Sequence, residues 1–326
     1  MAARLALVLF AAAAALVASA STAAAQQVLH GRVVRPGGGT RPGVAVQLHR
    51  VTQSARGQID STVAGPDGGF TFRLPKADSA AGFTVFFSTA IADGVRYFGP
   101  AIHPDESPAG YAITVYDTAS GPALADSVRV SRRDVFLIPD MDGSMQVAEI
   151  IRLRNPARRT LVSEGRPLVS ILLPPGVERF EAGEGDRADS ARASNPGLAR
   201  VGDRAWLTDP LVPGDRDFFF RYRLPAQVKR LPVAPGRATD TLFVYVRQPA
   251  PDVTASGIGE GVPFSAEGER FTRYMKTALA PGASVAIDWR GPRPPPVDPR
   301  WAALAIAGAI LAAGVVIAAR RSRAAG

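Results

Sequence analysis

Apolar and polar residues alternate in short runs over residues 28–116, with the two-residue period of a β-strand. Turns rich in glycine and proline separate the runs, and no amphipathic helical stretch lies between them. The runs read VLHGRVV, VAVQLHR, GFTFRLP, GFTVFFST, VRYFGP and YAITVY. This pattern predicts a first antiparallel β-sandwich over residues 26–118 rather than alternating strands and helices.

A second strand-rich region extends from Ser127 to Trp289. Its runs read VFLIP, MQVAEIIRLRNP, PLVSILLP, RAWLTDP, DFFFRYRLP, DTLFVYVRQP and ASVAIDW. A turn at Pro213 and Gly214 leads into an aromatic strand, as in a hairpin. The polar, glycine-rich interval 181–203 predicts a loop. We therefore expect a second β-sandwich over residues 119–290.

The N-terminal residues have the composition of a secretory leader. A basic start that includes Arg4 precedes an apolar stretch from Leu5 to Ala20, and small residues end at Ala25. These three parts predict a signal peptide over residues 1–25. An uncleaved signal anchor would export the same residues, so the bulk of the chain is expected outside the cytoplasm in both cases.

The C-terminal residues read as a membrane anchor. Residues 301–319 are free of charge, long enough to cross most of a hydrocarbon layer of about 30 Å. A proline-rich stalk precedes them at 291–300, and a basic tail follows at 320–326. The expected fold class is all-β, with two tandem antiparallel β-sandwich domains and one C-terminal transmembrane helix whose tail is cytoplasmic.

Three sequence elements of the first domain carry a resemblance to a known family. They are G-R-V at 31–33, P-G-V-A-V at 42–46 and G-P-D-G-G-F at 65–70. In this order they resemble the carboxypeptidase regulatory-like, transthyretin-like domain over about residues 27–118. The resemblance implies a prealbumin-like fold of about seven strands, grouped with carbohydrate-binding sandwiches and used as an accessory module. It implies no peptidase activity.

The positive charge does not indicate nucleic-acid binding. The formal net charge is +9, and more than half of it comes from five arginines beside the two apolar ends, Arg4, Arg300, Arg320, Arg321 and Arg323. Nucleic-acid recognition requires a clustered basic stripe with interleaved aromatic residues, which the remaining chain lacks. We expect no nucleic-acid partner.

The nearest approach to a catalytic motif is H-P-D-E at residues 103–106, which spells the H-x-x-E zinc pair of metallocarboxypeptidases. That family also needs a later histidine, and His103 is the last in the chain. His30 and His49 lie in predicted strands and could join a metal site only if the fold brought them together. The chain has no cysteine, which excludes disulfides and thiolate chemistry. We expect a surface loop at 103–106.

Other candidate motifs are incomplete. Residues 140–144 begin like a calcium loop, but Ile151 occupies the position where an EF-hand needs a glutamate, so a hairpin turn is the better prediction. Met141 and Met145 lack a third soft ligand for copper and are expected to pack. The run 37–39 is not a phosphate loop, because no Lys-Ser/Thr and no helix follow it.

The sequence alone leaves open whether two carboxylates form a catalytic pair for glycoside cleavage, because acids distant in sequence can converge in space. Glu149, Glu164 and Glu178 are examples, and nothing in the sequence marks any two of them. We expect no catalytic, cofactor-binding or metal-binding residues.

Several aromatic residues of the first domain could stack on sugar rings. They are Phe86, Phe87, Tyr97, Phe98 and Tyr111. Alternation sends only one of Phe86 and Phe87 inward, so the other needs a surface, a neighbour or a ligand. Packing in the core or between domains is the favoured interpretation.

These observations predict a non-catalytic, membrane-anchored binding or assembly module of the cell envelope, with an envelope protein as its partner. A carbohydrate-binding surface protein, with a polysaccharide as ligand, is the first alternative. A metal-dependent hydrolase is the second, and it depends on the H-x-x-E string alone.

Overall fold

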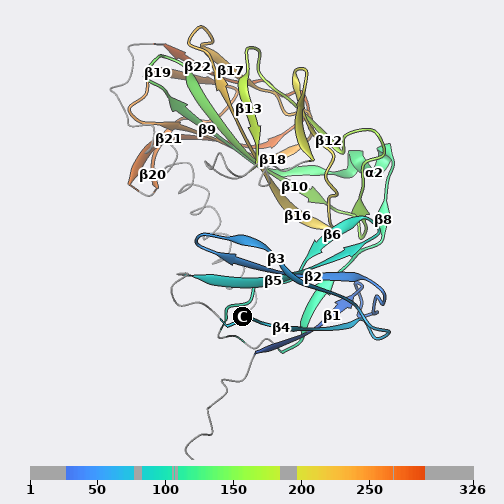
Figure 1. Cartoon of the computed structure of the whole chain (residues 1–326). Helices are drawn as coiled ribbons and strands as arrows, with labels where there is room; N and C mark the ends of the chain where they lie inside the picture. The colour runs from blue at the N-terminus through green and yellow to red at the C-terminus, as the bar shows by residue number, and fades with distance from the viewer. Residues whose placement is uncertain are drawn as a thin grey trace, which may run out of the picture. The chain divides into compact units, whose positions relative to one another are not determined.

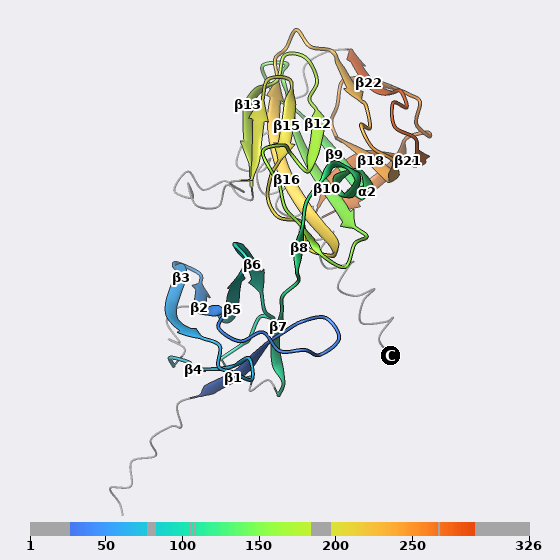
Figure 2. The ribbon, with the colours of Figure 1, turned by 90° about the vertical axis from the view of Figure 1, so that its right-hand side faces the viewer.

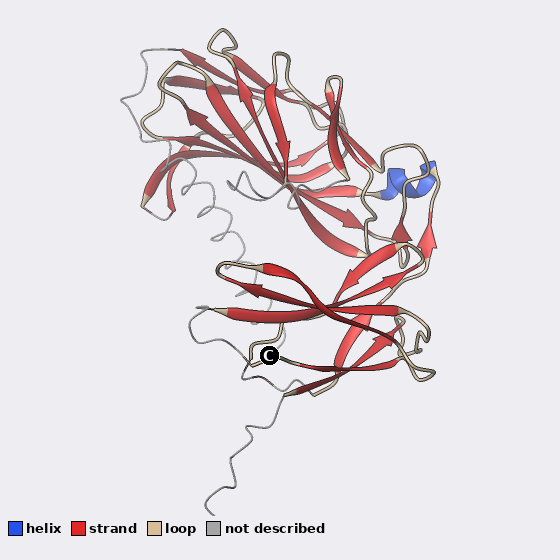
Figure 3. Cartoon of the chain, in the orientation of Figure 1, coloured by secondary structure: helices blue, strands red, loops and turns tan. Residues whose placement is uncertain are grey.

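The computed structural model describes residues 27–290 except 77–82, 105, 107–108, 184–196 and 267. The regular secondary structure of this part is almost entirely β-strand (Figure 3). It forms two compact units that divide between Tyr116 and Asp117. The expected leader, stalk, transmembrane helix at 301–319 and tail lie outside the described residues. Within them, no helix combines the length and the apolar character needed to cross a membrane.

The first unit is a β-sandwich of two sheets (Figure 1). The three-stranded sheet has the order β4-β1-β7, with β1 at Val28–Val34, β4 at Gly69–Arg73 and β7 at Tyr111–Thr114. The four-stranded sheet has the order β3-β2-β5-β6, with β2 at Ala45–Thr52, β3 at Arg56–Val63, β5 at Thr84–Ala92 and β6 at Val95–Phe98. Their inward rows form the core, which includes Leu29, Val33, Leu48, Phe72, Phe86 and Ile113.

Gly31 has a packing role in this sandwich. It pairs across the strands with Phe70, and a Cβ added at Gly31 would lie 2.3 Å from the Phe70 ring. The ring therefore lies against the backbone of β1, a close approach that only glycine allows. Gly68 has a different role: its φ of +73° closes the tight turn that leads into β4.

The second unit is built around a seven-stranded sheet with the order β13-β16-β10-β9-β18-β21-β20. The bounds are Glu178–Ala182 for β13, Gly214–Leu224 for β16, Met145–Asn155 for β10, Arg129–Pro139 for β9, Thr239–Arg247 for β18, Glu269–Leu279 for β21 and Val262–Ala266 for β20. The central strands are long, so this sheet supplies most of the surface on which the other layers pack (Figures 1 and 2).

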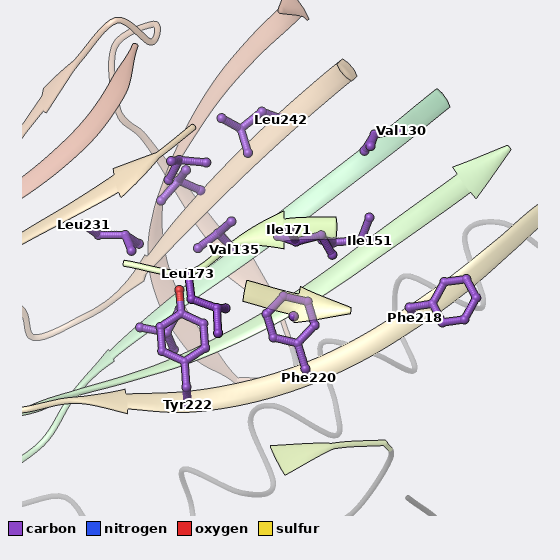
Figure 4. Packing of buried hydrophobic residues seen from close by; sticks show 14 of the residues in the cluster. Val130, Val135, Ile151, Ile171, Leu173, Phe218, Phe220, Tyr222, Leu231 and Leu242 are labelled. Carbon is purple, nitrogen blue, oxygen red and sulfur yellow. The ribbon is translucent and has the colours of Figure 1, made fainter. Parts of the chain in front are cut away.

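Shorter elements cover one face of the seven-stranded sheet. The β12-β15-β14 sheet comprises Val169–Leu172, Arg204–Leu207 and Leu198–Val201, and the β17-β22-β19 sheet comprises Arg230–Val233, Val285–Arg290 and Asp252–Ser256. The pair β8-β11 (Thr118–Ala119 and Thr160–Leu161) and the one-turn helix α2 (Pro122–Ser127) complete the unit. All of the sheets contribute to one large apolar core, in which Phe218, Phe220 and Tyr222 of β16 point the same way (Figure 4).

The expectation of purely antiparallel sheets is wrong at three pairings. The pairs β1/β7, β9/β18 and β8/β11 run parallel. Parallel neighbours need a long connection, and the other strands of the unit supply it between β1 and β7. Apolar alternation reports which face a residue occupies, but it carries no information on the direction of the neighbouring strand.

Several strands escaped prediction from the sequence. β3 is exposed along almost its whole length, so its sequence RGQIDSTV shows no apolar row. The predicted loop 181–203 contains the end of β13 and all of β14. Residues 184–196 of this interval lie outside the described residues. These are edge or partly exposed strands, where burial imposes little pattern.

Replacement of Gly31 by alanine is expected to destabilise the first unit by roughly 1–3 kcal/mol, because the new methyl group overlaps the Phe70 ring. Hydrogen exchange of amides in residues 27–116, followed by mass spectrometry, measures the effect. The matched control is Gly57→Ala in β3, where an added Cβ meets nothing within 4 Å. Equal exchange in the two variants would contradict the packing role of Gly31.

Candidate functional site

The H-x-x-E string forms a local turn. The Glu106 amide donates to the His103 carbonyl at 2.9 Å, and the His103 amide donates to the Glu106 carboxylate at 3.0 Å. That carboxylate oxygen is thus engaged by the backbone of its own turn, and the His103 residue is exposed. This arrangement agrees with the predicted surface loop.

The fold does not bring His30 and His49 together. His30 is exposed on β1 of one sheet, where it contacts Thr71, whereas His49 lies on the outer face of the other sheet. The two rings therefore project from opposite faces of the sandwich. Among the described residues, no group of three His, Asp or Glu side chains is arranged to hold a metal ion.

Residues 140–144 close the hairpin between β9 and β10. Asp142 accepts hydrogen bonds from the Ser144 amide and hydroxyl and pairs with Arg223. The Ser144 hydrogen bonds lower the pKa of Asp142 to about 2. Met141 is exposed at the tip while Met145 is buried, so only Met145 shows the predicted packing. The run 37–39 forms a turn closed by the Arg35 amide and the Gly39 carbonyl.

Glu149 is buried in the core of the second unit, whereas Glu164 and Glu178 are exposed. Its Oε2 accepts from Arg133 Nε at 2.8 Å, and its Oε1 accepts from the Tyr222 hydroxyl at 2.8 Å. Burial, with the adjacent Glu149 charge, raises the pKa of Tyr222 well above its usual value, which keeps this donor protonated. Both oxygens of the carboxylate are thus engaged inside the protein.

The five aromatic candidates divide between core and surface. Phe86, Tyr97 and Tyr111 are buried, and the Tyr111 hydroxyl accepts from the Ser88 amide and donates to the Pro100 carbonyl. Phe87 and Phe98 occupy the outer face of the four-stranded sheet, and Phe98 is 65% exposed. The predicted split between Phe86 and Phe87 is confirmed, with Phe86 inward.

The outer face of this sheet carries a ring platform made of His49, Phe87 and Phe98. The His49 and Phe87 rings are directly opposite across the strands, 4.9 Å apart and only 6° from parallel. Phe98 continues the row at 6.1 Å from Phe87, inclined by 35°. The three rings come from the neighbouring strands β2, β5 and β6 and pack against one another in a row that ends in the exposed Phe98.

Polar side chains border the ring platform. His49 Nε2 lies 3.1 Å from the Thr89 hydroxyl, and Arg96 donates to the Gln47 amide oxygen at 2.7 Å. Burial, together with the positive charge of Arg96, lowers the pKa of His49. The imidazole is therefore mainly neutral at pH 7, and it can stack without the cost of desolvating a cation.

The platform combines an apolar ring surface with hydrogen-bonding groups at its border. This combination suits a flat ligand that has apolar C–H faces and polar edges. The sequence points to Phe87 and Phe98 as ring-stacking residues, whereas it marks His49 only as a possible metal ligand. The sequence does show that Gln47 and His49 occupy the outer face of β2, because they flank the buried Leu48. That His49 lies beside Phe87 follows only from the pairing of β2 with β5.

Comparisons with known proteins leave the family open. No protein-family model and no curated protein sequence matches the chain. Among solved structures, an M1 zinc metallopeptidase from Deinococcus radiodurans aligns at 15% identity over 49% of this chain and 42% of that chain, with a TM-score of 0.26. The chain thus spans about two fifths of that peptidase.

Two pilins also align. The major pilin SpaA of Corynebacterium diphtheriae shows 11% identity over 67% of this chain and 61% of that chain, with a TM-score of 0.21. The major pilin SpaD of the same organism shows 9% identity over 80% and 81%, with a TM-score of 0.20. Alignments this weak carry no argument about activity or partners.

Replacement of Arg96 by glutamine is expected to raise the pKa of His49 while leaving it below 6.5, because burial is the larger cause of the shift. An NMR titration of the imidazole protons in the full chain measures it, with His30 on the opposite sheet as an internal control. Since folding lowers this pKa, its contribution to stability is complete above pH 6.5 and is lost as the pH falls below it. An unchanged His49 pKa would contradict the electrostatic coupling to Arg96.

Replacement of Glu149 by glutamine is expected to destabilise the second unit by roughly 3–5 kcal/mol, because it leaves the buried Arg133 without its counter-charge. The tryptophans are Trp206, Trp289 and Trp301, outside the first unit, so their fluorescence during urea denaturation follows this change. The exposed Glu178→Gln is the control, expected within about 0.5 kcal/mol of the parent. A loss equally small for Glu149→Gln would show that the pair is dispensable.

Proposed function

We propose that this chain is a non-catalytic binding module of the cell envelope and that the ring platform of its first unit binds a saccharide. The single observation that carries the proposal is the row of packed rings formed by His49, Phe87 and Phe98, which ends in Phe98 with 65% exposure. In this proposal the leader exports the chain, and residues 301–319 anchor it in the membrane, with the tail in the cytoplasm.

The chemistry of a sugar ring fits this surface. One face of a pyranose carries C–H groups that pack on an aromatic ring, while its hydroxyl groups project at the edge and need donors and acceptors. Phe98 offers an exposed ring at the end of the row in which His49 and Phe87 stack. Gln47 and Arg96 offer polar groups beside this row. The 65% exposed ring of Phe98 is apolar surface that a ligand or partner can cover.

The resemblance to the carboxypeptidase regulatory-like domain supports the same proposal. Its Gly31 and Phe70 elements have a structural explanation in this sandwich, and the family is grouped with carbohydrate-binding folds. The hydrolase alternative loses its main support, because Glu106 bonds to the backbone of its own turn. A protein partner on the same platform is the competing outcome of the binding test.

Replacement of Phe87 or Phe98 by alanine in the full chain is expected to weaken saccharide binding about tenfold, since one aromatic stacking contact contributes up to about 1.5 kcal/mol. A glycan array identifies the ligand, and affinity electrophoresis through gels containing that polysaccharide compares the variants. The control is Leu172→Ala, which removes an exposed apolar side chain in the second unit.

Two outcomes would contradict saccharide binding. The first is silence of the parent chain across cell-wall and matrix polysaccharides. The second is retention of binding in both phenylalanine variants, which would move the site away from the platform. Recovery of a stoichiometric protein from solubilised membranes, lost in Phe98→Ala, would instead assign the platform to a protein partner.

A further inference from the structure

A second aromatic cluster lies on the outer face of the seven-stranded sheet, opposite the large core. Its buried members are Phe136, Tyr245 and Phe271, and Phe243 and Phe264 pack partly buried against them. They come from the adjacent strands β9, β18, β21 and β20. The cluster belongs to a different unit from the ring platform and is independent of the proposed function.

Arg273 of β21 lies within this cluster. The register sets it between Tyr245 of β18 and Val262 of β20. Its guanidinium carbon is 5.2 Å from the centre of the Phe264 ring and 5.9 Å from the centre of the Phe243 ring. Cation–π attraction to two rings thus holds the charged group on the outer face of the sheet.

Arg273 differs from the other arginines on this face in having no acidic partner within the described part of the chain. Arg132 pairs with Asp134 at 2.6 Å, and Arg152 pairs with Asp217 at 2.7 Å. By contrast, Arg273 Nε is buried and has no hydrogen-bond partner among the described residues. A buried N–H that makes no hydrogen bond costs free energy, and a cation without a counter-charge adds to that cost.

We infer that Arg273 and the surrounding rings form a binding site for a carboxylate of an acidic polypeptide segment. The missing counter-charge defines the ligand group, because a carboxylate can bind the guanidinium in a bidentate manner. The apolar surroundings define what accompanies it: Val262 and Met275 are 44% and 48% exposed beside Arg273. The ligand therefore combines a carboxylate with an apolar side chain.

The spacing of these groups favours a polypeptide. Arg273 and Met275 are two positions apart on one strand and face the same side, about 6.8 Å apart. An extended peptide that crosses the face repeats its side chains at the same interval, so an acidic residue can meet Arg273 while an apolar residue two positions away meets Met275. Pro263 in the edge strand β20 lacks an N–H, which disfavours addition of the peptide to that edge.

The test uses the full chain and a matched pair of peptides. The probe is acetyl-Ser-Asp-Ser-Phe-Ser-amide with a 4-fluorophenylalanine, and its partner carries asparagine in place of aspartate. Fluorine NMR of the peptide resonance is expected to show at least tenfold tighter binding of the aspartate peptide. Arg273→Gln is expected to abolish that preference, and Arg273→Lys, which keeps the charge but loses the planar fork, is expected to retain part of it.

The control variant is Arg270→Gln, which removes an exposed arginine from the same strand and is expected to leave binding unchanged. Tryptophan fluorescence verifies that each variant keeps the parent fold. Equal affinity for the two peptides, or an equal effect of Arg270→Gln, would overturn the site. Arg273-dependent binding to phosphatidylglycerol vesicles without binding of the aspartate peptide would also overturn it and would assign the cation to a lipid surface.

Discussion

Successive side chains of a strand project from opposite faces of its sheet, so each row that enters the core commits the next row to the outside. This constraint determines which side chains each unit turns outward. In β5 of the first unit, burial of Phe86 turns Phe87 outward onto the ring platform. In β9 of the second unit, burial of Val135 and Leu137 turns Phe136 to the opposite face of the seven-stranded sheet. Both candidate binding surfaces are thus the outer rows of strands whose inner rows hold the fold together.

Much of this arrangement could be predicted from the sequence wherever one face is buried and the other is not. The clean alternation of β1, β5 and β10 identified them as strands, and the pair Phe86 and Phe87 identified one outward ring. What could not be predicted depends on contacts between distant segments. The parallel pairing of β9 with β18 joins segments separated by the described strands β10 to β17, and no local pattern encodes it. His49 became part of a ring surface only because β2 pairs with β5, which aligns it with Phe87.

Charge pairing on the outer face of the seven-stranded sheet reinforces its register. Arg152 is directly opposite Asp217 in the pairing of β10 with β16, and their side chains meet at 2.7 Å. An exposed pair of this kind contributes only about 0–1 kcal/mol, yet a one-residue slip of β16 would turn Asp217 toward the apolar core. Asp134 is more deeply buried, and burial raises its pKa although Arg132 opposes the shift. The same burial raises the pKa of Tyr245 to about 12, so its hydroxyl stays a donor to Asp134.

Arg133 and Arg273 lie on opposite faces of the same sheet and show two ways to stabilise a cation that is partly removed from water. Arg133 enters the core and meets Glu149, whose second oxygen accepts from Tyr222, so the charge and the carboxylate lone pairs are matched inside the protein. Arg273 meets ring faces, which attract the cation but accept no hydrogen bond from its Nε. In the first arrangement the cation and the carboxylate neutralise each other inside the protein, and the pair contributes to the fold. The second leaves the cation without a counter-charge among the described residues, and because Nε itself is buried, an external carboxylate would meet the terminal nitrogens of the guanidinium. This is the physical difference between an arginine that stabilises a core and one that recognises a ligand.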